Sequence, residues 1–208
     1  MKNYKFLYLV LLLFTVIGFV SCGETSDEES EYINWQSKNE TYFKNLRDSV
    51  RQLIKSGRTD WRIYPIWSQV DSVVGSKSDS IIIVHVEEAG KGSGCPIYSD
   101  SVRVHYYAWR MPSTSYPSGY VFDSSYSTNS YDESISIPSK IAVSGVVDGF
   151  STALQHMHIG DKWSVIVPYQ LGYGTSSSGT TVPPYSTLVF DIKLMAYYKA
   201  GQIVPVWK

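Results

Sequence analysis

The most informative segment of this chain reads VPPYSTLVFD and covers residues 182–191. Two prolines stand near its start, and its second half opens an alternation of apolar and other side chains. The apolar positions of that alternation are Leu188, Phe190, Ile192 and Leu194. Apolar residues at every second position are typical of a β-strand with one buried face. The segment therefore predicts a half-buried strand close to the C-terminal end of the chain.

Three upstream segments show the same two-residue period. Residues 81–86 are β-branched throughout except His85. In residues 102–109, one face carries Val102, Val104, Tyr106 and Ala108, and the positions between them are Arg103, His105, Tyr107 and Trp109. The third alternation has its apolar positions at Trp163, Val165 and Val167. Each of these patterns predicts a strand.

Residues 147–158 instead have the spacing of a short helix, with Phe150, Leu154 and Met157 on one face and Gly160 after its end. Several antiparallel strands around one short helix define an α+β fold.

The overall composition excludes several classes of protein. The 208 residues carry 18 Lys and Arg against 19 Asp and Glu, so a nucleic-acid binder with a basic face is not expected. Two cysteines are too few for a disulfide-dense scaffold or a Cys-rich zinc module. Hydrophobic residues make up 43% of the chain, which is enough to build a core.

The order and spacing of these segments resemble the FKBP-type peptidyl-prolyl isomerases over roughly residues 80–197. The matching stretches are residues 102–106 (VRVHY), 122–125 (FDSS), 145–149 (GVVDG), 154–160 (LQHMHIG), 167–168 (VP), 172–174 (GYG) and 182–191. The resemblance implies a twisted antiparallel sheet wrapped around a short helix, with an apolar active site between the two.

The resemblance also assigns roles to individual residues. It places the pocket walls at Tyr106, Phe122, Val143 and Phe190. It places a polar rim group at Asp123, a hydroxyl directed at the substrate carbonyl at Tyr173, and a covering loop residue at Val182. In the family, the backbone amide at the position of Val143 also donates to the bound peptide.

Three features depart from the family pattern. The pocket-floor tryptophan of the family falls on Val146, so the resemblance implies a substrate-binding position there that lacks a flat ring. The basic partner of the rim aspartate falls near Thr128. The stretch of residues 110–121 inserts about six extra residues before Phe122, and we expect it to form a flap beside the pocket.

The implied reaction is cis–trans isomerisation of X-Pro bonds, whose rotational barrier is about 18–20 kcal/mol. No covalent bond breaks, so neither a cofactor nor a metal is expected. A dry aromatic pocket stabilises the twisted amide better than water does, because rotation makes its carbonyl less polar. The alternative is an FKBP-shaped binding module or chaperone without catalysis, which Val146 and Thr128 favour.

Other candidate sites are weaker. The glycine-rich residues 90–94 lack the spacing of a phosphate-binding P-loop. His156 and His158 form a pair without further metal ligands, and Ser124 and Ser125 lack the nucleophile elbow of a serine hydrolase.

The N-terminus predicts export. Lys2 and Lys5 precede an apolar run at residues 6–20, which is too short to span a membrane as a helix and is typical of a signal peptide. The following Cys22 resembles the lipidated cysteine of bacterial lipoproteins, so residues 1–21 are expected to be removed. The acidic tether at residues 22–31 resembles export tags of surface lipoproteins in the Bacteroides group.

These features predict a lipid anchor in the bacterial cell envelope, in the outer membrane and facing the periplasm or the surface. The expected partners are proline-containing polypeptides and the membrane, with no nucleic acid. A lipoprotein of a surface nutrient-uptake complex is a further alternative that rests on the tether alone.

Between tether and sheet, residues 32–56 have a helical pattern, with an apolar stripe at Phe43, Leu46, Val50, Leu53 and Ile54 and a stop at Gly57. The stripe either packs on its own domain or serves as an arm for a homodimer or a client. We expect a neck and connector at residues 32–78, an isomerase domain at 79–198 and a tail at 199–208.

Overall fold

The computed structural model describes residues 31–68, 79–126 and 135–207. The signal peptide, Cys22, all of the tether except Glu31, and Thr128 lie outside these ranges. The chain divides into two units at residues 33 and 34, and the fold described below is that of the second unit, residues 34–208.

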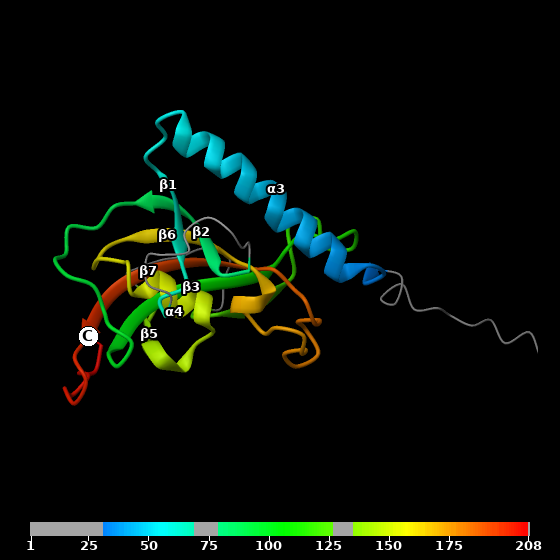
Figure 1. The fold of residues 1–208 in the computed structure, drawn as a ribbon. Helices are drawn as coiled ribbons and strands as arrows, with labels where there is room; N and C mark the ends of the chain where they lie inside the picture. Colours follow the sequence, from blue (N-terminus) through cyan, green and yellow to red (C-terminus); the bar gives the residue numbers. More distant parts are fainter. Residues whose placement is uncertain (1–30, 69–78, 127–134, 208) are drawn as a thin grey trace, which may run out of the picture. The chain divides into compact units, whose positions relative to one another are not determined.

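Two helices and seven strands make up the described part of this unit (Figure 1). The helices are α3 (Trp35–Lys55) and α4 (Asp148–Leu154). The strands are β1 (Trp61–Pro65), β2 (Ile81–Glu88), β3 (Ser101–Arg110), β4 (Val121–Ser124), β5 (Ser139–Ala142), β6 (Lys162–Val167) and β7 (Leu188–Tyr198). Two 3₁₀ turns, η1 (Val143–Gly145) and η2 (Tyr169–Leu171), complete the set.

The strands form one antiparallel sheet in the order β1-β2-β6-β7-β3-β4, with β5 also paired to β3. Strand β3 pairs with two different strands on the side away from β7: its first half pairs with β5 and its second half with β4. The four strands expected from sequence periodicity are all present, and the predicted α+β class is confirmed.

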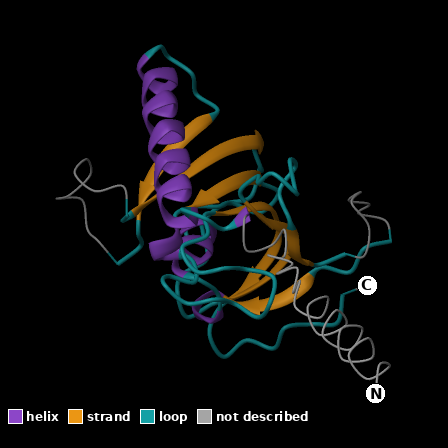
Figure 2. Cartoon of the chain, turned by 90° about the vertical axis from the view of Figure 1, so that its right-hand side faces the viewer, coloured by secondary structure: helices purple, strands orange, loops and turns teal. Residues whose placement is uncertain are grey.

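The two helices cover opposite faces of the sheet, as follows from the two-residue period of the strands. On β2, Ile82 and Val84 face the core that contains Phe150 and Leu154 of α4. Their neighbours Ile81 and Ile83 face the second core, which contains Phe43 and Val50 of α3. Figure 2 shows the long helix lying across the strands.

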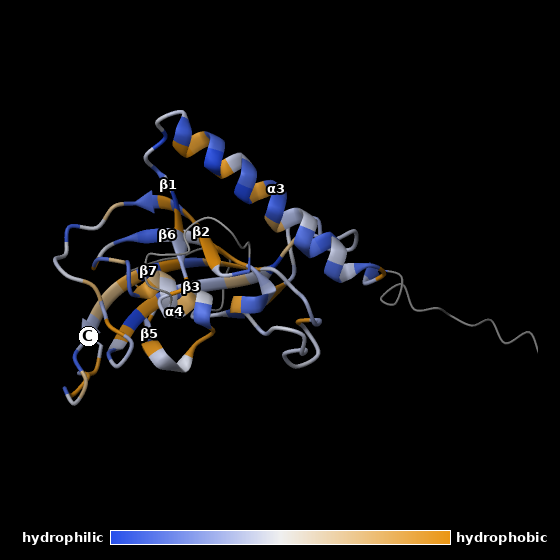
Figure 3. Ribbon diagram, viewed as in Figure 1, coloured by the Kyte–Doolittle hydropathy of each residue, from blue (hydrophilic) through white to orange (hydrophobic). Residues whose placement is uncertain are grey.

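Helix α3 packs its apolar stripe within the chain. Phe43 and Val50 are almost fully buried against the sheet, and Leu46 packs beside them, whereas Ile54 near the helix end is exposed. Hydrophobic and hydrophilic bands alternate along the helix (Figure 3). Of the two interpretations of the stripe, packing on its own domain accounts for its central residues. Neither α3 nor α4, the two helices of the described ranges, has the length and apolar composition that a membrane span requires.

The segment after α3 is more regular than its sequence suggests. Residues 61–65, expected as part of a packed connector, form the edge strand β1 and pair with β2 from Trp61 opposite His85 to Pro65 opposite Ile81. A proline is compatible with an edge strand, because one side of that strand has no ladder partner. The sheet therefore extends across the boundary expected at residues 78 and 79.

Helix α4 is shorter than the expected 147–158. It ends at Leu154, and the next amides of His156 and Met157 bond three residues back, as in a tightening last turn. Gly149 brings the helix close to β6, because a Cβ added there would lie 2.3 Å from Cγ1 of Val167. This close approach fixes the depth at which Phe150 sits under the sheet.

Candidate active site

Three aromatic residues of the sheet share the face that α4 covers. Tyr106 on β3 and Phe190 on β7 reach it by ordinary alternation, and both pack in the α4 core. Phe122 reaches it through an irregularity, because the register between β3 and β4 shifts where Ala108 faces Asp123 and Trp109 faces Val121. Such a bulge leaves one residue unpaired and re-aims its side chain. Phe122 contacts Phe190 and Asp123 contacts Tyr106, so both residues lie beside these aromatic rings.

The rings form a chain of edge-to-face contacts. Phe190 lies 5.1 Å from Phe150 and 6.1 Å from Phe122, centroid to centroid, each pair at 85°. Phe122 in turn contacts Tyr173 at 6.3 Å, and Tyr106 contacts Phe150 at 5.9 Å. Near-perpendicular contacts of this kind stabilise aromatic clusters beyond the area that they bury.

Phe150 was not among the expected site residues. The sequence placed it correctly on the inner face of the short helix, but that pattern alone does not separate a core residue from a pocket floor. In the structure it lies between Tyr106 and Phe190, and it is 3% exposed. It is the one aromatic ring from α4 in this cluster of described residues.

The polar edge of the cluster is formed by Tyr106 and Asp123. The Tyr106 hydroxyl donates to Oδ2 of Asp123 at 2.9 Å, and Oδ1 of the exposed Asp123 accepts the amide of Ser124 at 2.8 Å. Burial raises the pKa of Tyr106 well above its ordinary value, and the neighbouring Asp123 raises it further. Tyr106 is therefore a neutral phenol whose donor is directed at the rim carboxylate.

Tyr173 lies on the turn that follows η2 and is 37% exposed. Gly174 beside it has φ +66, and its amide donates to the carbonyl of Tyr169, which closes the turn. No described residue bonds the Tyr173 hydroxyl, while its ring contacts Phe122. The side chain thus combines one apolar contact inside the cluster with a hydroxyl available to a ligand.

The three valines expected at the site occupy different surroundings. Val143 and Val182 are buried in the α4 core, at 0% and 2% exposure, and Val146 is half-buried against it. The amide of Val143 donates to the carbonyl of Asp100 at 3.0 Å. Donation of that amide to a peptide, as expected from the family, therefore requires this bond to be shared or released.

The insertion at residues 110–121 packs away from the ring cluster. Its buried Arg110 lies over the rings of Trp35, Tyr116 and Tyr120, at 5.8, 5.4 and 4.8 Å from the centroids. Cation–π contacts of a desolvated guanidinium are stabilising. The loop is thereby fixed against the start of α3.

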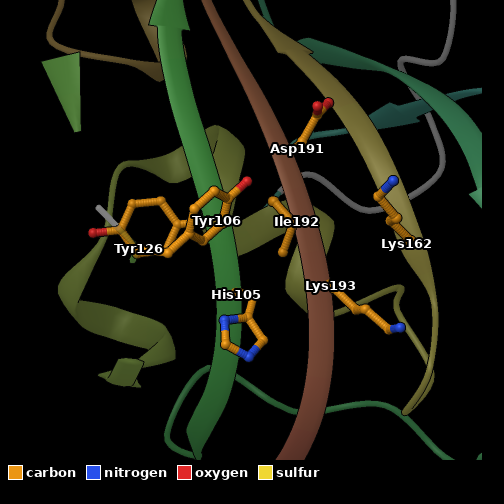
Figure 4. A pocket seen from close by; sticks show the side chains of 7 residues that line it. All are labelled: His105, Tyr106, Tyr126, Lys162, Asp191, Ile192 and Lys193. Carbon is orange, nitrogen blue, oxygen red and sulfur yellow. The ribbon is translucent and has the colours of Figure 1, made fainter. Parts of the chain in front are cut away.

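A separate small hollow lies among strands β3, β6 and β7 (Figure 4). It has a volume of ≈ 20 Å³, and its lining residues are His105, Tyr106, Tyr126, Lys162, Asp191, Ile192 and Lys193. A space of that size holds about one water molecule, so it cannot admit a proline ring. The described residues contain no cluster of three or more His, Cys, Asp or Glu suited to a metal ion.

Comparison with known proteins agrees with this architecture. Residues 95–195 match the family model of the FKBP-type peptidyl-prolyl cis-trans isomerases. The FKBP-type 22 kDa peptidyl-prolyl cis-trans isomerase of Escherichia coli is 34% identical over 120 residues, which cover 58% of this chain and 52% of that protein. The outer membrane protein MIP of Legionella longbeachae is 37% identical over 114 residues, covering 55% and 43%.

Solved structures show the same fold. A peptidyl-prolyl cis-trans isomerase from Pseudomonas syringae superposes with a TM-score of 0.50 at 22% identity, covering 77% of this chain and 96% of that one. FkpA from Escherichia coli gives the same score and identity, covering 96% and 84%. The chain spans about half the length of the first curated relatives it matches. Residues 95–195, which contain β3, β4, β5, β6, α4 and most of β7, belong to the FKBP-type peptidyl-prolyl cis-trans isomerase family.

Proposed function

We propose that this protein is a peptidyl-prolyl cis-trans isomerase and that the ring cluster around Phe190 is its active site. The observation that carries the proposal is the chain of perpendicular rings with one polar edge, the Tyr106–Asp123 hydrogen bond. The family membership of residues 95–195 supports the same activity. Tyr106, Phe122, Asp123, Val143, Tyr173 and Phe190 are the proposed catalytic residues, with Val146 and Val182 in substrate binding.

The proposed mechanism needs no bond-breaking group. The proline ring packs against Phe190, which Phe150 supports from α4, and the X-Pro carbonyl faces the hydroxyl of Tyr173, a residue that is 37% exposed. Twisting the amide reduces the polarity of its carbonyl, so an apolar wall favours the twisted state over the planar one. Each tenfold acceleration requires about 1.4 kcal/mol of such selective stabilisation.

Val146 stands in place of the pocket-floor tryptophan of the family, and Phe150 does not restore the lost surface. The ring of Phe150 packs against Phe190 from α4 but is only 3% exposed, while Val146 is half-buried against the same core. A floor of this kind offers a proline ring less apolar area than a tryptophan does. We therefore expect an active enzyme with weaker peptide binding than a tryptophan floor would give.

Proline-containing polypeptides of the cell envelope are the proposed substrates. The signal-like residues 1–21 and the lipobox cysteine Cys22 support a lipid anchor, placed in the outer membrane and facing the periplasm or the surface. One similar protein bears the name outer membrane protein MIP, which agrees with an envelope location. The anchoring segment itself lies outside the described residues.

A binding module without catalysis is the second candidate, and Val146 is the observation that favours it. Refolding of a denatured protein whose slow phase is limited by proline isomerisation separates the two functions. An isomerase at a small fraction of the substrate concentration raises the rate constant of the slow phase. If only stoichiometric amounts raise the refolded yield, and the rate constant stays fixed, the chain is a binding protein and the isomerase proposal is wrong.

A further inference from the structure

Helix α3 makes direct polar contacts with the segment that precedes β7. The Nε1–H of Trp35 donates to Oγ of Ser186 at 2.9 Å, and Oδ1 of Asn39 accepts the backbone amide of Thr187 at 2.6 Å. The Nδ2 group of Asn39 donates to the carbonyl of Trp35 at 2.8 Å. Asn39, Ser186 and Thr187 are 0%, 3% and 1% exposed. Hydrogen bonds at such depth are costly to lose, because water cannot replace them.

The contacted segment is continuous with the proposed pocket on both sides. Oγ of Ser186 donates to the carbonyl of Pro183 at 2.7 Å, next to the buried Val182. The amide of Tyr185 donates to the carbonyl of Gly174 at 2.9 Å, next to Tyr173. Trp35 and Asn39 therefore hold Ser186 and Thr187, and this segment is hydrogen-bonded to the chain neighbours of Val182 and Tyr173, the two loop residues proposed for the site.

The same segment contains a backbone conformation that requires support. Tyr185 has φ +63, a left-handed conformation that residues other than glycine rarely adopt. Strained residues persist where the surrounding structure holds them. The ring of Tyr185 contacts Tyr169 at 5.2 Å, and the hydroxyl of Tyr169 donates to Oε1 of Glu40 at 3.2 Å. Glu40 is thus a third residue of α3 that reaches this loop.

The insertion at residues 110–121 also holds the segment that precedes β7. The amide of Met111 donates to the carbonyl of Thr187 at 3.0 Å, so both backbone groups of Thr187 are bonded, one to the insertion and one to α3. Arg110 lies over the ring of Trp35 and joins the two supporting elements. The blue start of α3 and the green loop between β3 and β4 meet in Figure 1.

We propose that Trp35 and Asn39 are positioning residues of the isomerase site, which hold residues 172–187 in the arrangement that binds peptide. The inference rests on the proposed function and deepens it, since it assigns α3 a part in substrate affinity. A loop that leaves this arrangement lowers the fraction of binding-competent protein, and the apparent affinity falls by that fraction. Isomerisation within the bound complex is not affected.

The test compares Trp35→Phe and Ser186→Ala, singly and together, in the full chain. Trp35→Phe keeps an aromatic ring but removes the donor, and Ser186→Ala removes the acceptor. NMR exchange spectroscopy on an Ala-X-Pro-X peptide should give a half-saturating peptide concentration about three- to tenfold higher for each variant, with the maximal rate changed less than about twofold. The effect of the double variant should be smaller than the sum of the two single effects, because the Trp35–Ser186 bond is lost only once; Ser186→Ala also loses the bond to the carbonyl of Pro183.

Val50→Ala is the matched control. Val50 is 1% exposed and anchors the same helix to the sheet, but it belongs to the core beneath α3 and not to the loop contacts. It should lower stability and leave peptide affinity unchanged. If Val50→Ala weakens affinity as much as Trp35→Phe does, α3 acts only through general stability and the positioning role is refuted.

A second measurement does not depend on catalysis. Hydrogen exchange at the amides of Tyr185 and Thr187 should accelerate at least tenfold in Trp35→Phe, while the amide of Val165 in the sheet stays protected. Unchanged exchange at Tyr185 and Thr187, together with unchanged affinity, would overturn the inference. If the wild-type chain binds peptide without accelerating its isomerisation, the proposed isomerase activity is refuted but the positioning role is not. Peptide affinity and amide exchange in the variants would then decide the positioning role.

Discussion

Tyr106 and Tyr173 differ in what their hydroxyls can do. The hydroxyl of Tyr106 is committed to Asp123 at 2.9 Å, and the burial that raises its pKa keeps it protonated. The hydroxyl of Tyr173 bonds no described residue, and the side chain is 37% exposed. The Tyr106–Asp123 pair therefore fixes the shape of the polar rim, and the hydroxyl of Tyr173 is the one that can donate a hydrogen bond to a substrate.

Position 146 provides a direct test of the pocket floor. Val146→Trp adds a large ring at a half-buried position against the α4 core, next to the proposed contact surface for proline. Burying more apolar area against the proline ring should strengthen peptide binding by about three- to tenfold. Titration of a proline peptide against wild type and variant measures this. Weaker binding, with the fold intact, would show that Val146 does not face the substrate.

Asp191 predicts a pH dependence of stability. Burial raises the pKa of Asp191 above its ordinary value. The hydrogen bond from Ser164 and the charges of Lys162 and His85 lower this pKa, but by less than burial raises it. An acid with a raised folded-state pKa costs stability once it ionises, so the free energy of unfolding falls as pH rises from about 4 through the raised pKa. Asp191→Asn should therefore be more stable than wild type at pH 7.

The gain from Asp191→Asn should shrink toward zero below about pH 4, where the wild-type carboxyl is protonated in both states. Urea unfolding of both proteins between pH 3.5 and pH 7 measures the difference. If the difference in unfolding free energy between the two proteins is constant over this range, or favours wild type at pH 7, burial is not the main influence on the pKa of Asp191.

Among the elements, the close packing of α4 against β6 determines how near Phe150 lies to the ring cluster. Gly149→Ala would place a Cβ 2.3 Å from Cγ1 of Val167, so either the helix or the strand must shift. Overpacking of this kind costs about 1–3 kcal/mol, which urea unfolding detects. Gly145→Ala is the control, because its nearest atom would be the Cβ of Ala142 at an ordinary 3.7 Å. Equal stability of the two variants would contradict this account of α4.

The sequence predicted those elements whose period is long and unbroken. β3, β6, β7 and α3 appear close to the expected bounds, because the burial of one face imposes a repeating pattern along each of them. β2 is buried on both faces and was predicted from its run of β-branched residues. β1 was not predicted as a strand, because its five residues with a terminal proline are too short for a clear period. The bulge that turns Phe122 inward depends on pairing with β3, which lies outside local sequence.

The residues that support the site could not be predicted from the sequence, for a similar reason. Asn39 stands four residues before Phe43, so it interrupts the apolar face of α3 with a polar side chain, and that was the available signal. Its partner Thr187 lies 148 residues away, and no spacing rule joins the two. Phe150 was placed on the correct helix face, yet its position beneath Phe190 depends on how closely α4 approaches the sheet.

For the whole molecule, the proposed anchor predicts a change of location on a single substitution. Cys22→Ser removes the thiol that would carry the lipid, so the protein should leave the membrane fraction and appear in the soluble fraction of fractionated cells. Mass spectrometry of the wild-type N-terminus should show an acylated cysteine. Retention of Cys22→Ser in the membrane at the wild-type level would contradict the lipid anchor. The ring cluster would be unaffected by that result.

As an active site, the ring cluster around Phe190 should accelerate rotation about X-Pro bonds. NMR exchange spectroscopy on a short Ala-X-Pro-X peptide, with and without the protein, measures that acceleration directly. We expect faster cis–trans exchange with wild type and a rate about two- to tenfold lower with Tyr173→Phe, which loses one hydroxyl contact. Unaccelerated exchange with a folded wild-type protein would contradict the claim, and full activity in Tyr173→Phe would remove that hydroxyl from the mechanism.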